Sequence, residues 1–263
     1  MLAQLVLTTA EAKKLISKAV WKLPQVQKAK SEGWIVIHPS STTAFLYEEL
    51  TGTMPSEAWV FGVSAPGGLC RSKTAINMLH TAPDGKPEDR KIWTFQKGKL
   101  APPMSLDEIL SIMGEGDVFV KGCNALDHLG KTAVLTSSPK TGGTIGKVIS
   151  MQRSRHFSLV LPVGLEKLIP GTISGVHDFL GERKADAGMG IGCGIFPVQG
   201  LKMDERDALK LLCGVEAIAG AAGGLCGAEG ASILYVDDTE VKIHQMMELI
   251  QSISNAKLPE LDL

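Results

Sequence analysis

Short apolar runs alternate along the chain with amphipathic stretches. The run Trp34 to His38 is apolar almost throughout, which is typical of a strand that is buried on both faces of a parallel sheet. The stretch Ala10 to Leu23 instead has the helical period, with Thr9 as its expected N-cap. Similar patterns predict strands at 58–63, 118–120, 133–136, 157–161 and 232–236, an edge strand or hairpin arm at 92–96, and helices at 40–50, 72–79, 105–113, 144–155, 204–212 and 239–252. Strands separated by helices indicate right-handed βαβ units, so we expect an α/β fold with a mostly parallel sheet.

Length and composition are those of an ordinary globular domain. The chain has 263 residues, of which 44% are hydrophobic and 21% are charged. Residues 169–200 contain eight glycines and few periodic stretches, so this segment is either a glycine-rich lid or a small inserted subdomain. We therefore expect a single α/β domain over residues 1–263 that carries this appendage.

Charge and the length of the apolar runs limit the classes of partner. The net charge of -1 gives no basic surface for nucleic acid. Apolar runs such as Phe157 to Val163 are far shorter than the roughly 20 residues of a membrane helix. The first nine residues have no charged leader before their apolar stretch, which argues against a signal peptide. We expect a cytoplasmic homo-oligomer that binds neither nucleic acid nor membranes.

The cysteines and histidines lack the spacing of a metal site. The five cysteines include no Cys-x-x-Cys pair, and no two of the six histidines are four residues apart. The alternating glycines at 188–194 lack the Gly-x-Gly-x-x-Gly order of a dinucleotide site. We therefore expect no metal and no cofactor.

The junction at 117–130 is the strongest candidate for a functional site. A short apolar strand ends there in a glycine turn at Gly122, and the turn carries the amide of Asn124 and the carboxylate of Asp127. Ligands of open α/β sheets bind at the carboxyl ends of strands, where such polar groups meet a crevice. We expect the chemistry of the protein at this junction.

Three further segments have the composition of an anion-binding helix N-terminus, namely 39–43, 141–147 and 220–230. Together with Gly122, their candidate ligand-binding residues are Ser40, Ser41, Thr42, Thr43, Gly142, Gly143, Thr144, Gly223 and Gly224. Each segment also has a simpler interpretation. The hydroxyls of the first suit an ordinary N-cap, Val148 stands where a P-loop requires Ser or Thr, and close backbone packing explains the glycines of the third.

Two of these segments resemble known families. The Gly-Cys-Asn-Ala-Leu-Asp sequence at 122–127 resembles the Gly-Ala-Asp-Glu-Val-Asp segment of ribose-5-phosphate isomerases, and with Gly130 it resembles the Gly-Ala-Asp loop of methylthioribose-phosphate isomerases. Residues 41–43 are similar to the Gly-Ser-Thr phosphate loop of those isomerases and of sugar-phosphate-sensing repressor domains. The resemblance implies the Rossmann-like three-layer fold that sugar-phosphate isomerases share with coenzyme A transferases.

The departures from the isomerase pattern leave two functions open. Asn124 stands where the family has its first acidic residue, and an amide cannot carry the proton that isomerisation moves. Asp127 matches the second acid and remains the candidate base. We expect a small anionic metabolite, such as a phosphorylated sugar or a nucleotide-like compound, bound either by an isomerase-like enzyme or by a non-catalytic sensor in which Asn124 holds the ligand.

A third alternative on the same fold is acyl or coenzyme A transfer. Glu229 lies between Gly227 and Gly230 and would be the carboxylate nucleophile, because a glycine-flanked turn exposes both the carboxylate and backbone donors for an oxyanion. A solvated surface charge or a loop cap is the simpler interpretation of Glu229.

These interpretations make two structural predictions. The strands near Trp34, Trp59, Val118, Ser158 and Ser232 should lie in one, mostly parallel sheet. In addition, residues from the strand-end loops should line one cleft, because loops at the same edge of a sheet converge. These residues are Ser41, Thr43, Asn124, Asp127 and Gly143.

Overall fold

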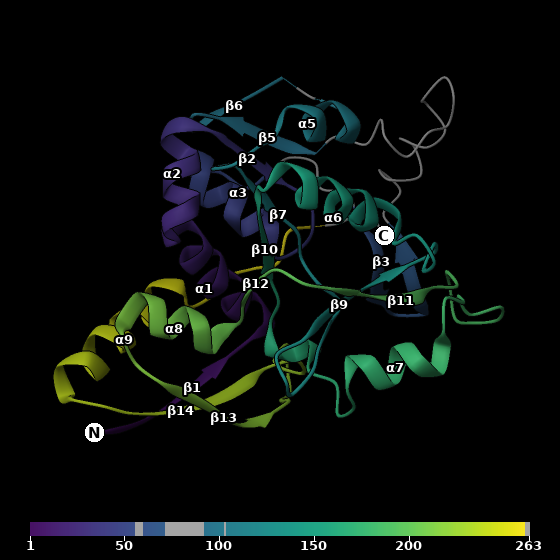
Figure 1. Ribbon diagram of the computed structural model, residues 1–263. Helices are drawn as coiled ribbons and strands as arrows, with labels where there is room; N and C mark the ends of the chain where they lie inside the picture. The colour runs from purple at the N-terminus through teal and green to yellow at the C-terminus, as the bar shows by residue number, and fades with distance from the viewer. Residues whose placement is uncertain (56–59, 72–91, 103, 261–263) are drawn as a thin grey trace.

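A computed structural model describes residues 1–55, 60–71, 92–102 and 104–260 of the chain (Figure 1). The predicted helix at 72–79 and the first part of the predicted strand at 58–63 lie outside these ranges. In the part of the chain that is described, no helix combines the length and the apolar character that crossing a bilayer requires.

The described residues form a mixed α/β structure. Its strands are β1 (Leu2–Leu7), β2 (Trp34–Ile37), β3 (Phe61–Ala65), β4 (Gly68–Arg71), β5 (Trp93–Gln96), β6 (Lys99–Leu100), β7 (Val118–Val120), β8 (Ala125–Leu126), β9 (Thr132–Thr136), β10 (Ser158–Pro162), β11 (Gly194–Val198), β12 (Leu201–Met203), β13 (Ala217–Ala222) and β14 (Ser232–Asp237). Its helices are α1 (Thr9–Lys22), α2 (Pro24–Glu32), α3 (Thr43–Thr51), α5 (Leu106–Ile112), α6 (Gly143–Arg155), α7 (Ile173–Leu180), α8 (Glu205–Cys213) and α9 (Glu240–Ile253), with a 3-10 turn, η2, at Leu165–Lys167.

The central sheet has the strand order β12-β10-β7-β2-β5-β6. Strands β12, β10, β7 and β2 run parallel, whereas β5 and β6 are antiparallel additions at one edge. The predicted parallel arrangement of the strands near Trp34, Val118 and Ser158 is therefore confirmed. The continuous apolar runs explain this result, because each of these strands is buried along nearly its whole length.

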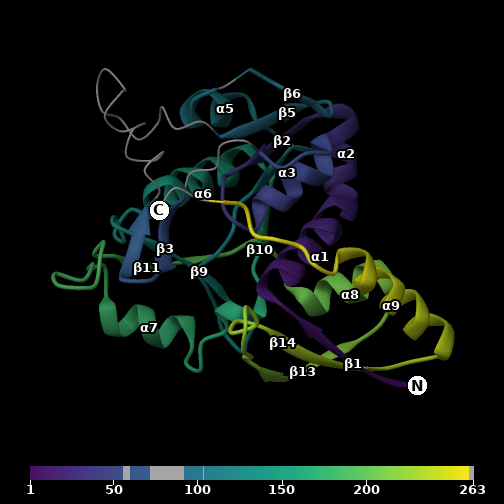
Figure 2. The same cartoon turned by 180° about the vertical axis from the view of Figure 1, so that it is seen from behind.

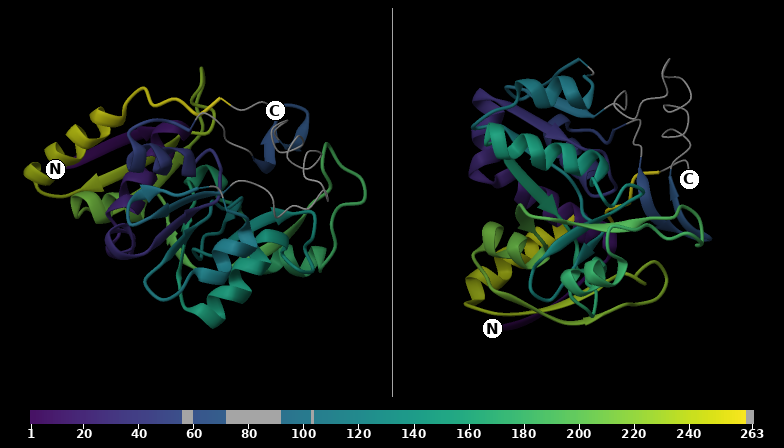
Figure 3. Two further views of the ribbon diagram at one scale, coloured as in Figure 1. Left: turned by 90° about the horizontal axis from the view of Figure 1, so that it is seen from above. Right: turned by 45° about the vertical axis from the view of Figure 1, so that its right-hand side comes forward.

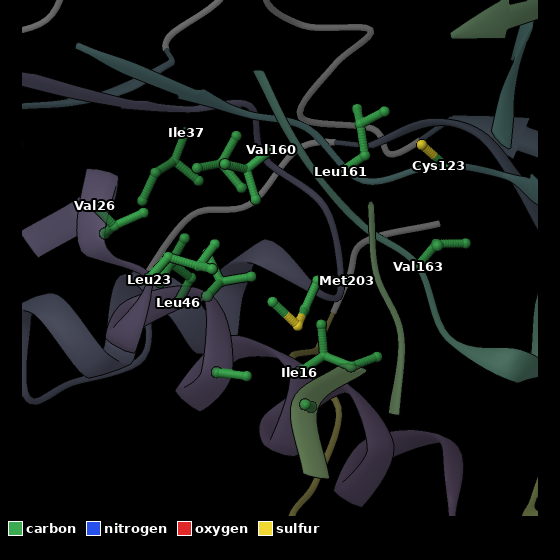
Figure 4. Close-up of a cluster of buried hydrophobic side chains, with 14 of the residues drawn as sticks. Ile16, Leu23, Val26, Ile37, Leu46, Cys123, Val160, Leu161, Val163 and Met203 are labelled. Atoms are coloured by element: carbon green, nitrogen blue, oxygen red, sulfur yellow. The ribbon is translucent and has the colours of Figure 1, made fainter. Parts of the chain in front are cut away.

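Helices α1 and α2 pack against this sheet and bury the main hydrophobic core. Figure 4 shows Leu23, Val26 and Leu46 from the helical side facing Ile37 and Val160 of the sheet. All five side chains are 7% exposed or less, so this layer is a dry core that fixes α1 relative to the ends of the strands.

The prediction that all five strands share one sheet is wrong. Strand β14, near Ser232, lies in a separate antiparallel sheet between β1 and β13 (Figure 2). Among the described strands, β3, which begins at Phe61, pairs only with β4, in an antiparallel hairpin. The N-terminal strand β1 explains the first difference, because it runs antiparallel to β14 and pairs with it along six residues.

The glycine-rich segment 169–200 contains α7 and β11. Strand β11 pairs antiparallel with β9, and α7 packs against β11 (Figure 3). Backbone hydrogen bonds also join this segment to the β3–β4 hairpin, since the N–H of Leu69 donates to Met189 and the N–H of Ile191 donates to the carbonyl of Leu69. The segment therefore holds the hairpin beside the strand ends of the central sheet.

Candidate functional site

Polar side chains follow each of the four parallel strands. Ser41 comes after β2, Asn124 after β7, Glu166 and Lys167 after β10, and Glu205 after β12. Because the carboxyl ends of parallel strands meet at one edge of the sheet, these groups are brought together from distant parts of the sequence.

A pocket of about 420 Å³ lies at this edge. Its polar lining residues are Lys13, Ser41, Ser64, Asn124, Glu166 and Lys167, and its apolar lining residues are Val63, Leu135, Leu168 and Ile169. The volume falls within the range of about 300–1,000 Å³ that is usual for small-molecule sites. The β3–β4 hairpin forms one wall, which is why its attachment to segment 169–200 matters for the site.

Lys13 enters the pocket from α1. A capping box between Thr8 and Glu11 fixes the start of this helix and thereby the direction of its second turn. The Lys13 side chain is only 8% exposed, and its Nζ donates to Ser41 Oγ at 3.1 Å and lies 3.6 Å from Glu166 Oε1. Burial, aided by the positive charge of Lys167, lowers the pKa of Lys13 to about 8.

Glu166 is a buried carboxylate with unused hydrogen-bonding capacity. Neither oxygen accepts a hydrogen bond from any residue that the structure describes, and Lys13 Nζ lies 3.6 Å from Oε1. The carboxylate packs over Gly164, where a Cβ atom would lie 1.8 Å from Oε2. A buried acceptor without a donor costs free energy, so Glu166 is ready to accept hydrogen bonds from a ligand.

Lys167 adds a second positive charge. Its Nζ donates to the carbonyl of Cys123 at 2.6 Å, which leaves further N–H donors of the ammonium group for a ligand. The Cys123 thiol is buried, and burial raises its pKa, so it stays protonated and is no nucleophile at neutral pH.

Glu205 lies behind the pocket and contributes little negative charge. Burial, reinforced by the nearby charge of Glu166, raises the pKa of Glu205 to about 8. Its oxygens accept from the N–H of Leu165 at 3.0 and 2.9 Å, and Ser232 Oγ lies 3.4 Å away. At neutral pH the two lysines of the pocket are therefore opposed mainly by Glu166.

Asn124 lines the pocket, as predicted, but its amide is held by the backbone. Its Nδ2 donates to the carbonyl of Gly62, and its Oδ1 accepts from the N–H of Leu135, both at 3.0 Å. The amide thus joins the end of β7 to β3 and β9. This arrangement makes Asn124 a positioning residue for the pocket wall.

Asp127 is fully buried and anchors a loop. Oδ1 accepts from the backbone N–H groups of Leu129 and Lys131, and Oδ2 accepts from that of Ile173, at 2.9–3.0 Å. Burial alone would raise the pKa of Asp127, but these three hydrogen bonds outweigh it and hold the pKa below its usual range. Asp127 is not among the lining residues of the pocket, so the geometry does not favour it as the base.

Of the four hydroxyls at 40–43, only that of Ser41 reaches the pocket of 420 Å³. Ser40 Oγ accepts from the N–H of Thr43, and the Thr43 hydroxyl donates to the carbonyl of His38 at 2.7 Å. Thr42 is buried. Gly122 lets the strand ends approach, because a Cβ there would lie 3.0 Å from Ser40 Oγ. Most of this cluster therefore caps the turn before α3.

A smaller pocket of about 70 Å³ adjoins the first and shares Asn124 and Leu135 with it. It lies at the N-terminus of α6, where Gly142 and Thr144 line it together with His38 and Lys121. Gly142 is the N-cap of α6, has a left-handed conformation with φ of 75°, and provides no side chain to cap the helix. Gly143 follows it as the first residue of the helix and is not among the lining residues.

The glycine-rich loop between β13 and β14 lines neither pocket. Glu229 is exposed, and both of its oxygens accept from the N–H of Gly227, at 3.2 and 3.0 Å. Gly223 and Gly224 shape the same loop, and a Cβ at Gly224 would lie 2.5 Å from the carbonyl oxygen of Ala228. Close packing accounts for these glycines.

The sequence reasoning missed Lys13, Glu166 and Lys167. Signals for them exist, because Glu166 and Lys167 follow the buried run at 157–163 just as Asn124 follows β7. Lys13 falls three residues from both Ala10 and Ile16 on the buried face of α1, where a lysine is unusual.

Within the described ranges, no group of three His, Cys, Asp or Glu side chains is placed to hold a metal ion. The polar groups that line the pocket are two lysines, one carboxylate, two hydroxyls and one amide. Comparison with protein-family models, with curated proteins and with solved structures finds no match to this chain.

Proposed function

We propose that the chain binds a small anionic metabolite, such as a phosphorylated sugar or a nucleotide-like compound, at the carboxyl ends of its parallel strands. The observation that carries this proposal is the convergence of Lys13 and Lys167 on one pocket in which Glu166 is the opposing carboxylate. Two ammonium groups with restricted access to water attract an anion more strongly than surface lysines do.

The smaller pocket suits a phosphate group. Its walls include Lys121, Thr144 and the N-terminus of a 13-residue helix, whose backbone dipole favours negative charge. The larger pocket next to it offers Ser41 and Glu166 to hydroxyl groups. A sugar phosphate has this division into an anionic end and a hydroxyl-bearing end.

We also propose that the fold is related to the Rossmann-like fold of ribose-5-phosphate isomerases and coenzyme A transferases. The support is the set of parallel strands β12-β10-β7-β2 with the pocket at their carboxyl ends. The antiparallel β1-β14-β13 sheet is an addition to that arrangement.

For an isomerase-like enzyme, the pocket provides Glu166 in place of Asp127 as the group that moves a proton. Glu166 accepts no hydrogen bond from the described residues, lies beside Lys13 and lines the pocket, whereas Asp127 accepts three backbone hydrogen bonds and does not line the pocket. No observation favours transfer through Glu229, because its carboxylate is turned onto its own loop. A sensor that recognises its ligand through the Asn124 amide is not favoured either, since the amide nitrogen and the amide oxygen both form hydrogen bonds with the backbone.

Isothermal titration calorimetry with ribose 5-phosphate tests the binding proposal. Loss of a charged donor to the ligand costs about 1.5–3 kcal/mol, so Lys167→Met should raise the dissociation constant by about 10–100-fold. Lys131→Met is the matched control, because Lys131 is exposed, does not line this pocket, and its Nζ donates to Ser174 Oγ at 3.4 Å. Equal affinities of wild type and Lys167→Met, or no binding of sugar phosphates and nucleotides at all, would overturn the proposal.

A further inference from the structure

Lys13 differs from its neighbours on the same helix. Lys14 and Lys18 point outward with 24% and 29% of their side chains exposed, and each is paired with a glutamate of α3. Lys13 is 8% exposed and ends in a pocket large enough for a metabolite. A lysine that only solubilised the helix or paired with a surface carboxylate would not need this position.

We propose that Lys13 is a nucleophile that forms an imine with a carbonyl group of the ligand. This inference rests on the ligand-binding function proposed above, and it narrows the substrate class to anionic aldehydes and ketones. The geometry that supports it is the convergence of an amine, a hydroxyl and a carboxylate on one point of the pocket wall, from Lys13, Ser41 and Glu166.

The reaction needs only groups that are present. The neutral Nζ adds to the carbonyl carbon and forms a C–N bond, while one proton of the amine passes to the carbonyl oxygen to give a carbinolamine. The carbinolamine then loses water as its second N–H proton joins the leaving hydroxyl, and a C=N bond remains. Glu166 takes up and returns each proton, so amine and carbonyl give imine and water without an oxidant or a reductant.

The surroundings of Nζ make the amine available. Burial and the charge of Lys167 favour the neutral amine, whereas Glu166 opposes them in part, and the balance gives Lys13 a pKa of about 8. At pH 8 about half of Lys13 is then neutral, against less than about 1% of an ordinary lysine with a pKa of about 10.4. The Ser41 hydroxyl accepts a hydrogen bond from the amine and so holds its direction.

Reductive trapping tests the inference. The full-length protein is incubated at pH 8 with dihydroxyacetone phosphate or with pyruvate in the presence of cyanoborohydride, which reduces an imine to a stable secondary amine. Peptide mass spectrometry then locates any mass gain that equals the probe less one oxygen atom. We expect labelling of Lys13 to exceed that of Lys14 by at least about tenfold, because Lys13 has a lowered pKa and ends in the pocket, whereas Lys14 is partly exposed and paired with Glu48. Localisation in the wild-type chain decides the question even where a variant does not fold.

Two variants sharpen the result. Lys13→Arg should lose the label, and Lys14→Arg should keep it, with urea unfolding confirming that both are folded. Label spread evenly over the lysines of α1, or no label with either probe, would overturn the inference. Glycerol 3-phosphate has no carbonyl group, so its binding tests the proposed ligand-binding function separately from imine formation. Binding of glycerol 3-phosphate without labelling by dihydroxyacetone phosphate would overturn imine formation alone, whereas labelling of Lys13 without binding of glycerol 3-phosphate would support the imine and count against phosphate recognition.

Discussion

Two buried regions at the strand ends differ in how many hydrogen bonds their carboxylates accept. In the loop after β8, three backbone N–H groups surround Asp127. At the end of β10, Glu166 accepts no hydrogen bond from the described residues and lies 3.6 Å from Lys13 Nζ, and Glu205 behind it has a raised pKa. Burial is common to all three, so the number of donors separates a carboxylate that supports the fold from one that is free for a ligand.

The difference matters for any assignment of a catalytic base. A base needs an unoccupied lone pair within reach of the substrate. The Asp127 carboxylate instead accepts hydrogen bonds from the backbone. Asp127 was the base expected from sequence, yet it is Glu166 that lines the pocket. The following predictions test this contrast.

The largest expected effect is a pH dependence of stability that comes from Glu205. The folded chain keeps the proton of Glu205 up to about pH 8, whereas the unfolded chain loses it near the ordinary carboxyl pKa of about 4.3. This contribution is therefore complete below about pH 4 and is lost as the pH rises to about 8, by up to about 1.4 kcal/mol per pH unit. Glu205→Gln should flatten the slope.

Urea unfolding at several pH values between 5 and 9, for wild type and Glu205→Gln, measures this slope. Asp127 has the opposite sign, because its pKa is lowered in the folded chain, and its contribution is lost only in acid. The pKa of Lys13 is also lowered in the folded chain, to about 8. Lys13 therefore makes the free energy of unfolding increase as the pH rises above about 8. Parallel curves for the two proteins would show that Glu205 is ionised at neutral pH and would remove the contrast with Asp127.

Removal of the Asp127 carboxylate should have the next largest effect. Asp127→Ala leaves the buried N–H of Ile173 and the part-buried N–H groups of Leu129 and Lys131 without their acceptor, which we expect to cost about 3 kcal/mol of the free energy of unfolding. Asp127→Asn keeps one side-chain oxygen and should lose less. Urea unfolding at pH 7 gives both values, and a stable Asp127→Ala variant without ligand binding would instead return Asp127 to the site.

Much of the central sheet could be predicted from the sequence, but the antiparallel sheet of β1, β14 and β13 could not. The runs at 34–37, 118–120 and 159–162 are apolar throughout, as expected of strands covered on both faces, and this pattern can be read from the local sequence alone. The strand at 232–237 is also apolar, but it pairs with β1, more than 220 residues away. Exposed apolar residues at Leu2 and Val6 hide the alternation of β1, so no local signal gives its partner.

The site was only partly predictable for a similar reason. Ser41 and Asn124 line the pocket because strand ends attract ligands in any open parallel sheet. Whether a polar side chain at a strand end faces the pocket or the backbone depends on long-range neighbours. Asn124 hydrogen-bonds to Gly62, and Asp127 hydrogen-bonds to Ile173. In each pair the two residues are more than 40 positions apart in the sequence.

Replacement of Glu166 should affect stability less than replacement of Asp127. Glu166→Gln loses no hydrogen bond from the described residues, and Lys13 can respond by giving up its proton. We expect the pKa of Lys13 to fall below about 8, with a loss of about 1–2 kcal/mol of stability at pH 6 and none at pH 9. Urea unfolding at both pH values measures the loss, and a loss at pH 9 that equals the loss for Asp127→Ala would place Glu166 in the same structural class.

The smallest effect is expected at Glu229. Its carboxylate is exposed, accepts from the N–H of Gly227 and lines neither pocket, so Glu229→Gln should change the dissociation constant for ribose 5-phosphate by less than about twofold. Acyl transfer would require this carboxylate to attack a thioester and form a covalent acyl intermediate. Calorimetry with ribose 5-phosphate, together with a transfer assay on acetyl-coenzyme A, compares the variant with wild type. Acyl transfer by wild type that disappears in Glu229→Gln would move the chemistry to the β13–β14 loop, and the contrast between Asp127 and Glu166 would then concern the fold alone.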